Sequence, residues 1–194
     1  MNKVVSDYRT NLSSLLRGIH SIPSQFDCEI SDLTLDSRQV KPGSCFLSIG
    51  AGIKQTIANM RDSVVRGSAA ILTDKDVVRG FNDVPVFVLQ DLGNRVGEIA
   101  ERFFKYPSSD LRVCAVTGTN GKTTVSYLTA LAIHFLEGKC GYIGTLGAGE
   151  VKNLEGTSHT TLDAVTMRRW LAGFKSSGAS SANVEASSHG IAQG

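Results

Sequence analysis

The sequence predicts an α/β protein, with a small α/β domain followed by a second domain built on a parallel sheet. Short apolar runs alternate with segments in which apolar residues recur every three or four positions, which is the order of strands and helices in such proteins. A glycine-containing turn at residues 117–121 joins one apolar run to the next helical segment. The 194 residues are 41% hydrophobic and 20% charged, and this composition indicates a globular chain and excludes a disordered one.

The first half predicts alternating helices and strands. Periodic apolar positions indicate helices, and Gly67 stands where a glycine often ends one. Short apolar runs bounded by turn residues indicate strands. The predicted helices cover residues 8–19, 53–67 and 92–103, and the predicted strands lie at 30–35, 45–49, 69–72 and 84–89.

Residues 106–110, with the sequence YPSSD, interrupt this pattern and predict a domain boundary, although an ordinary surface loop is the alternative. The second half then restarts as strand, helix, strand, which predicts a parallel sheet with helices on its faces. Thr160 and Asp163 have the spacing of a capping box for the last helix. The strands are expected at 113–116, 142–143 and 182–186, and the helices at 125–135 and from 163 to Gly178.

Charge and cysteine content exclude several classes of protein. The formal net charge is +2, which gives no support for nucleic-acid binding. The sequence has no apolar run of the length that a transmembrane helix needs and no signal-peptide pattern at its start. Its four cysteines are widely spaced, so we expect neither a disulfide framework nor a metal framework, and a cytoplasmic protein. Cys45 and Cys114 are predicted to be buried core thiols.

The strongest chemical signal is a phosphate-binding loop at residues 116–124, with the sequence VTGTNGKTT. It follows a predicted strand and opens a predicted helix, as such a loop must. Gly118 and Gly121 allow a tight turn in which backbone N–H groups point at one anion, and the helix N-terminus adds its positive dipole end. Lys122 can neutralise phosphate oxygens, and the Thr123 hydroxyl can ligate Mg²⁺.

Val116 stands where the usual pattern G-x-x-x-x-G-K-[ST] has its first glycine. The alternative is therefore a strand-to-helix turn that binds nothing. Kinases, ATPases and ligases all use loops of this kind, so the loop alone does not define a reaction.

The TGTNGKTT of this loop resembles the phosphate loop of the Mur ligase family, the ATP-dependent amide-forming enzymes of peptidoglycan precursor synthesis. Three further segments resemble the same family, in the same order along the chain. LTLDSR at 33–38 with PGSCF at 42–46 resembles the start of its UDP-binding domain, and TTLD at 160–163 is similar to a TTPD element after the loop. VEASSHG at 184–190 resembles a segment of the member that adds the third amino acid.

The resemblance implies a ligase that joins a diamino acid, meso-diaminopimelate or L-lysine, to UDP-MurNAc-L-Ala-D-Glu through an acyl phosphate. It implies a UDP-sugar-binding domain over residues 1–108 and an incomplete central ATP-binding domain over 109–194. It also implies ATP and Mg²⁺ as cofactors, small-molecule substrates, a monomer, and neither nucleic acid nor membrane as a partner.

The resemblance also assigns roles to individual residues. For Glu185 the residue pattern agrees, because an acidic residue within a small, apolar strand is costly unless it is paired or metal-bound. Taken alone, Ser37 and Thr160 fit simpler roles, in a turn that ends a strand and at a helix N-cap. The assigned ATP-binding residues are Gly118, Thr119, Asn120, Gly121, Lys122, Thr123 and Thr124, with Lys122 catalytic; the Mg²⁺ ligands are Thr123 and Glu185; the substrate-binding residues are Leu35, Ser37, His159, Thr160, Thr161, Ser187 and Gln193.

The sequence departs from the family pattern in three places. Residues 50–57 replace a run that usually carries an Asp-Gly pair, and Leu162 replaces a proline. The sequence also ends at Gly194, before the lysine of the second metal site and the domain for the incoming amino acid. We therefore expect this chain to be inactive alone. The alternatives are a catalytically dead nucleotide- or UDP-sugar-binding module, a degenerate gene product, and a small P-loop kinase.

Overall fold

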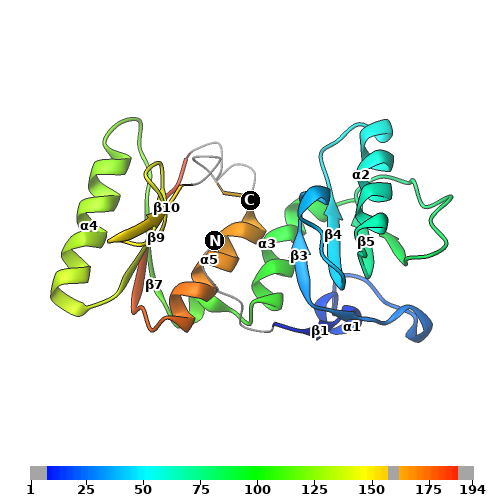
Figure 1. The fold of residues 1–194 in the computed structure, drawn as a ribbon, viewed down its shortest axis with the longest axis horizontal. Coiled ribbons are helices and arrows are strands. Elements are labelled where there is room, and N and C mark those ends of the chain that lie inside the picture. Colours follow the sequence, from blue (N-terminus) through cyan, green and yellow to red (C-terminus); the bar gives the residue numbers. More distant parts are fainter. Residues whose placement is uncertain (1–7, 157–161, 188–194) are drawn as a thin grey trace. The chain divides into compact units, whose positions relative to one another are not determined.

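The computed structural model describes residues 8–156 and 162–187. Its contacts fall into two compact units, and the chain passes from the first to the second between Phe103 and Phe104. Each unit has a sheet and a core of its own (Figure 1). This confirms the predicted α/β class, while the binding roles predicted for residues 1–108 and 109–194 remain predictions.

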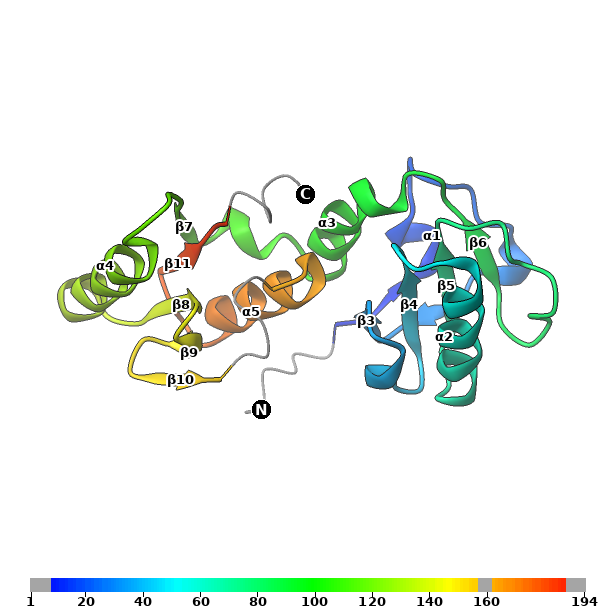
Figure 2. The same cartoon turned by 90° about the horizontal axis from the view of Figure 1, so that it is seen from above.

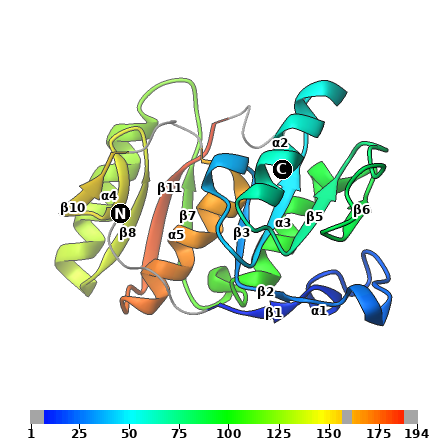
Figure 3. The ribbon, with the colours of Figure 1, turned by 45° about the vertical axis from the view of Figure 1, so that its right-hand side comes forward.

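The first unit is built on a parallel four-stranded sheet in the order β3-β4-β5-β6. Helices α2 and α3 lie on opposite faces of this sheet (Figure 3). A small antiparallel pair, β1 with β2, and the short helix α1 complete the unit. The bounds are β1 Thr10–Asn11, α1 Leu12–Leu15, η1 Ser24–Phe26, β2 Glu29–Ile30, β3 Asp32–Thr34, η2 Ser37–Gln39, β4 Ser44–Ser48, α2 Ile53–Val65, β5 Ala70–Thr73, β6 Val86–Val88 and α3 Leu92–Phe103.

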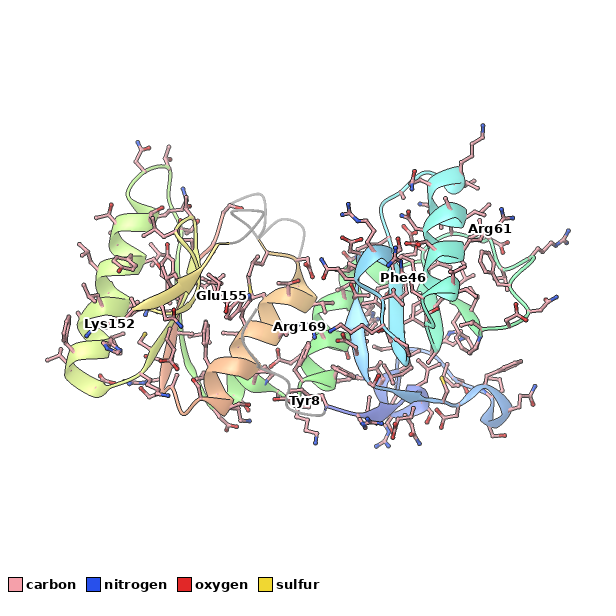
Figure 4. The ribbon with its side chains drawn as sticks, in the orientation of Figure 1. Tyr8, Phe46, Arg61, Lys152, Glu155 and Arg169 are labelled. Carbon is pink, nitrogen blue, oxygen red and sulfur yellow. The ribbon has the colours of Figure 1, made fainter. Side chains whose placement is uncertain are left out.

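The core of this unit forms as the periodicity predicts. The α3 residues at positions 92, 96, 99, 100 and 103 are all buried, so one stripe of the helix faces the protein. On the α2 side of the sheet, Met60 packs with Phe46, Ile71 and Val40 in one buried cluster. Phe46 is labelled in Figure 4. Gly67 follows α2 with a φ of +91°, the left-handed conformation that favours glycine after a helix.

The helix predicted over residues 8–19 is wrong. Only Leu12–Leu15 are α-helical, and Thr10–Asn11 form a strand that pairs with Glu29–Ile30. The backbone N–H of Leu12 donates to the carbonyl of Cys28 at 2.9 Å, which places the helix start against a distant segment. Non-local pairing therefore overrides the helical spacing of the leucines.

The second unit has a five-stranded sheet in the order β10-β9-β8-β11-β7. Strands β7, β11 and β8 are parallel, whereas β8, β9 and β10 form an antiparallel meander that the prediction of a parallel sheet missed. Helices α4 and α5 cover opposite faces of the sheet (Figure 2). The bounds are η3 Pro107–Ser109, β7 Arg112–Val116, α4 Lys122–Glu137, β8 Cys140–Gly144, β9 Gly147–Glu150, β10 Asn153–Glu155, α5 Ala164–Ser176 and β11 Ser181–Glu185.

Two predictions of burial in this unit are wrong. Cys114 is exposed because β7 is an edge strand of the sheet formed by the described residues, whereas Cys45 and Cys140 are buried. Most of the predicted apolar stripe of α4 faces outward, with Leu128 55% and Phe135 68% exposed, although Leu131 packs against the core. This helix is apolar on more than one side. Its fully buried residues are the small Ser126 and Ala130, and Tyr127, Leu131 and Ile133 pack partly buried beside them.

The start of α5 also differs from the expected capping box. Asp163 is the N-cap, and its carboxylate accepts hydrogen bonds from the Thr166 backbone N–H at 2.9 Å and the Thr166 hydroxyl. Thr160 lies outside the described residues. In the described part of the chain, none of the helices combines the length and the apolarity needed to cross a bilayer.

Candidate nucleotide and metal site

The candidate site of the second unit lies where three parallel strands end at the same edge of the sheet. The loop at 117–121 follows β7, Thr145 follows β8, and Glu185 is the last residue of β11. The register pairs Glu185 with Val116, directly before the loop. The carboxyl ends of parallel strands are where α/β proteins bind ligands, so the topology alone brings the predicted loop and the predicted acidic residue together.

The loop has the backbone conformation that its glycines allow. Gly118 has a φ of +146° and Gly121 a φ of +78°, both in the left-handed range that favours glycine. Gly121 is the N-cap of α4, and its carbonyl accepts the Val125 N–H at 2.9 Å. The exposed N-terminus of a 16-residue helix therefore faces the loop, which makes this end suitable for an anion.

Lys122 bends back over the loop. Its Nζ donates to the carbonyl of Gly118 at 2.7 Å and to that of Thr119 at 3.4 Å. These contacts hold the positive charge above the same turn whose N–H groups can face a phosphate. Thr119, Asn120 and Thr124 are exposed around it, so the loop residues that the resemblance assigns to ATP lie on an accessible surface.

Glu185 is the centre of a hydrogen-bond network at the end of β11. Oε2 accepts from the Thr123 hydroxyl at 2.9 Å and from the Thr145 hydroxyl at 3.0 Å. Oε1 accepts from the Thr145 backbone N–H at 3.0 Å and from the Tyr142 hydroxyl. Only 5% of Glu185 is exposed, and four donors satisfy its buried carboxylate.

These contacts decide the charge of Glu185. Burial acts to raise the pKa of the carboxyl, but hydrogen bonds from Tyr142, Thr123 and Thr145 outweigh it, and the net pKa is lowered. Burial and the hydrogen bond to Glu185 raise the pKa of the Tyr142 hydroxyl, which therefore stays protonated as a donor. At neutral pH the site holds a fixed negative charge beside the loop.

The donor set suits a hard divalent cation. Thr123 and Glu185 offer a hydroxyl and a carboxylate oxygen within 2.9 Å of each other, and Mg²⁺ prefers few oxygen ligands from protein together with phosphate oxygens and water. Among the described residues there is no cluster of three His, Cys, Asp or Glu side chains that could hold a metal by itself. The site therefore fits a cation that arrives with a phosphate better than a permanently bound metal.

Sequence reasoning missed the residues around Glu185. Tyr142, Gly144 and Thr145 come from β8 and the turn after it, and they meet Glu185 because β8 lies beside β11. A Cβ at Gly144 would overlap both the Glu185 carboxylate and the Tyr142 hydroxyl, so the carboxylate needs glycine there. Thr145, a polar residue directly after a strand of the same sheet, is the one that the sequence could have indicated.

A separate pocket lies in the first unit, around the residues assigned to the uridine end of the substrate. Ser37 opens η2 and is 7% exposed, and Asp36 caps this turn by accepting the Arg38 N–H at 3.0 Å. The opposite wall belongs to α2, where the Gln55 side-chain amide donates to Asn59 at 2.7 Å. The pocket is lined by Leu35, Asp36, Ser37, Arg38, Gln55, Ala58, Asn59 and Asp62.

The remaining assigned residues are placed only in part. Ser187 follows Ala186 just past the end of β11, and the Ala186 N–H donates to the Val116 carbonyl at 2.9 Å. That bond continues the pairing of β11 with β7 and keeps this segment near the loop. His159, Thr160, Thr161 and Gln193 lie outside the described residues.

Comparison with known proteins gives consistent matches. Residues 116–194 match the family described as the Mur ligase middle domain. A relative from Pseudomonas aeruginosa, named UDP-N-acetylmuramoyl-L-alanyl-D-glutamate--2,6-diaminopimelate ligase, is 39% identical over 170 residues, 87% of this chain and 35% of that protein. The chain thus spans about a third of the length of the curated relative it matches.

Solved structures agree with this match. A structure of a ligase with the same name has a TM-score of 0.81 and 32% identity, and the match covers 95% of this chain and 37% of that one. The MurF ligase from Thermotoga maritima, solved in complex with ADP, has a TM-score of 0.53 and 14% identity, with 80% of this chain and 32% of that chain covered. The second likeness concerns the fold alone.

Proposed function

This chain belongs to the Mur ligase family, and from that premise we propose that it is part of an ATP-dependent ligase of peptidoglycan precursor synthesis. The proposed reaction joins 2,6-diaminopimelate to the D-glutamate of UDP-N-acetylmuramoyl-L-alanyl-D-glutamate. The name of the Pseudomonas aeruginosa relative supports this choice of diamino acid. ATP and UDP-linked sugars are cytoplasmic metabolites, so the proposal places the reaction in the cytoplasm, and it requires no nucleic-acid or membrane partner.

The observation that carries the proposal is the 2.9 Å hydrogen bond between Thr123 and Glu185. It joins the first turn of α4, directly after the phosphate loop, to the end of the neighbouring strand β11. A bound Mg²⁺ would supply charge neutralisation for the phosphates. Thr123 and Glu185 would hold it, and the loop N–H groups and the N-terminus of α4 would hold the phosphates themselves.

Lys122 has the role of the catalytic cation in this proposal. Its amine lies over the loop on backbone carbonyls, from which it can turn to a phosphate oxygen without breaking a buried contact. The γ-phosphoryl group passes from ATP to the D-glutamate carboxylate, giving ADP and an acyl phosphate. The incoming amine then attacks the acyl carbon, the amide bond forms, and phosphate leaves. Positive charge at Lys122 favours the approach of the two anions.

The pocket of the first unit is proposed to bind the uridine end of the UDP-sugar. Leu35 can pack on the base, and the largely buried Ser37 also lines the pocket. The amides of Gln55 and Asn59 offer both donors and acceptors, which a pyrimidine ring with carbonyl and N–H groups requires. Residues 49–52, the loop between β4 and α2, carry no Asp-Gly pair and have no role in this proposal.

Equilibrium binding to the purified 194-residue chain tests the proposal. Calorimetric titration with ATP in the presence of Mg²⁺, and separately with UDP, should show one site for each ligand. Binding of both supports the proposal, whereas binding of neither contradicts it. Phosphate release measured with UDP-MurNAc-L-Ala-D-Glu and diaminopimelate separates the alternatives: binding without turnover supports the prediction of a chain that is inactive alone.

A further inference from the structure

The two oxygens of the Glu185 carboxylate are held by different sets of donors. Oε2 faces the hydroxyls of Thr123 and Thr145, so it is the oxygen on the side of the phosphate loop. Oε1 faces the Tyr142 hydroxyl and the Thr145 backbone N–H. Thr145 therefore contacts both oxygens, and Tyr142 contacts Oε1 alone.

We propose that Tyr142 is a positioning residue, whose hydroxyl holds Oε1 of Glu185 so that Oε2 stays directed at Thr123 and the phosphate loop. This inference rests on the proposed function, in which Thr123 and Glu185 hold the cation of a bound nucleotide. Groups that orient a metal-binding side chain in this way contribute to metal affinity without touching the metal.

The surroundings of Tyr142 suit a fixed donor. The side chain is 0% exposed and lies in a buried cluster under α4 with Ala130, Cys140 and Val151. Its ring packs edge-on against Tyr127, with ring centroids 5.5 Å apart and an interplanar angle of 89°. A ring clamped in this way holds its hydroxyl in one place, so the carboxylate that accepts from it is held as well.

Strand geometry supports the same assignment. Tyr142 pairs with Asn183 in the parallel register of β8 and β11. Side chains alternate between the two faces of a strand, so Glu185, two positions beyond Asn183, projects to the face that α4 covers. Gly144 leaves the space between the Tyr142 hydroxyl and the carboxylate open, because a Cβ there would overlap both.

A purely structural role for Tyr142 makes a different prediction. A buried tyrosine in a core needs some partner for its hydroxyl, and then loss of the hydroxyl would alter stability and nothing else. Tyr142→Phe separates the two roles, because it keeps the ring and removes only the donor. Tyr127→Phe is the matched control, since the Tyr127 hydroxyl makes only a 3.5 Å contact with the Val151 carbonyl, away from Glu185.

The experiment measures binding of a fluorescent ATP analogue to the full chain, with Mg²⁺ and with EDTA. For Tyr142→Phe we expect affinity in Mg²⁺ to fall about tenfold, the scale seen when groups that orient metal ligands are removed, with affinity in EDTA unchanged. The spectrum of bound Mn²⁺, used in place of Mg²⁺, should also change in electron paramagnetic resonance. Tyr127→Phe should behave as wild type in each measurement.

Gly144→Ala provides a second route to the same test if Tyr142→Phe does not fold. It retains the Tyr142 ring but displaces the carboxylate from the hydroxyl, and it should lower affinity in Mg²⁺ selectively. Equal loss in Mg²⁺ and EDTA, or wild-type affinity in both variants, would overturn the inference while leaving the proposed function standing. If wild type binds the analogue no better with Mg²⁺ than with EDTA, the proposed function fails and this inference fails with it.

Discussion

Replacement of Glu185 by glutamine or by alanine should separate the folding role of this residue from its binding role. The carboxylate accepts four hydrogen bonds, and Gln can keep most of them. Its amide oxygen can face the Tyr142 hydroxyl and the Thr145 N–H, which have a proton to donate. Its NH₂ can face the hydroxyls of Thr123 and Thr145, because a hydroxyl can rotate to accept.

The magnitudes follow from this count. Glu185→Gln loses charge-assisted hydrogen bonds but leaves no buried donor alone, so it should lower the free energy of unfolding by about 1 kcal/mol. Glu185→Ala leaves the buried Tyr142 hydroxyl without its acceptor, at a cost of ~1–3 kcal/mol, and the more accessible donors of Thr123 and Thr145 add less. The alanine variant should therefore be less stable by about 2–4 kcal/mol.

Urea unfolding followed by tryptophan fluorescence measures this difference. Trp170 is the single tryptophan of the chain and packs against the core of the second unit, so its signal reports on that unit. Glu29→Ala, which removes an exposed ion pair with Arg9 in the other unit, is the control and should leave the Trp170 transition unchanged. Equal destabilisation by the Gln and Ala variants would refute the assignment of four donors to this carboxylate.

Three further changes test other parts of the account. Lys122→Ala should weaken ATP binding in calorimetry by tenfold or more, about 1.4 kcal/mol. Its urea transition should be unchanged, because the Lys122 amine contacts only loop carbonyls. An ATP affinity equal to that of wild type would contradict the role of Lys122. Asn59→Ala should abolish UDP binding and spare ATP binding, and persistent UDP binding would exclude the α2 pocket. Hydrogen bonds from Ser13 lower the pKa of Asp27 below its value in the unfolded chain. These bonds therefore stabilise the folded state above about pH 4, and this stabilisation is lost as the pH falls through the pKa of the folded state. Asp27→Asn should flatten the acid limb of stability measured by circular dichroism, and an unaltered limb would contradict this.

The spacing of apolar residues correctly predicted the helices that have a single apolar face. The spacing of Leu92, Val96, Ile99 and Phe103 predicts α3, and all four are buried. The same reasoning failed for α4, because a helix that is apolar on several sides does not reveal which side meets the sheet. Exposed Phe135 of α4 lies under the Lys152 ammonium, which is 4.5 Å from the centre of its ring.

The strands that the sequence did not predict form through pairing with segments that are distant along the chain. Thr10–Asn11 form a strand only because Glu29–Ile30 lie beside them. The antiparallel strand β9 contains glycines at 147 and 149 with φ of +128° and +149°, and a Cβ at either would approach the backbone of the neighbouring strand β10. Small residues of this kind carry no alternation of apolar and polar side chains, so the strand pattern is absent from the sequence.

In the candidate site, too, local patterns identified some residues and strand pairing brought in the others. Lys122 and Thr123 belong to a local motif, and Glu185 is recognisable as an acidic residue in an apolar strand. Tyr142 and Gly144 act on Glu185 only through the lateral pairing of β8 with β11, which no local pattern contains. Sequence therefore indicated the groups that would meet the ligand, and the structure added the groups that hold one of them in place.

The central claim is that the phosphate loop, Thr123 and Glu185 form one site for a nucleotide and its divalent cation. Calorimetric titration of the wild-type chain with ATP, in Mg²⁺ and in EDTA, tests it most directly when repeated with Glu185→Gln. We expect wild type to bind ATP at least tenfold more tightly in Mg²⁺, about 1.4 kcal/mol, and the variant to bind equally in both. A Glu185→Gln variant that retains the full preference for Mg²⁺ would contradict the claim.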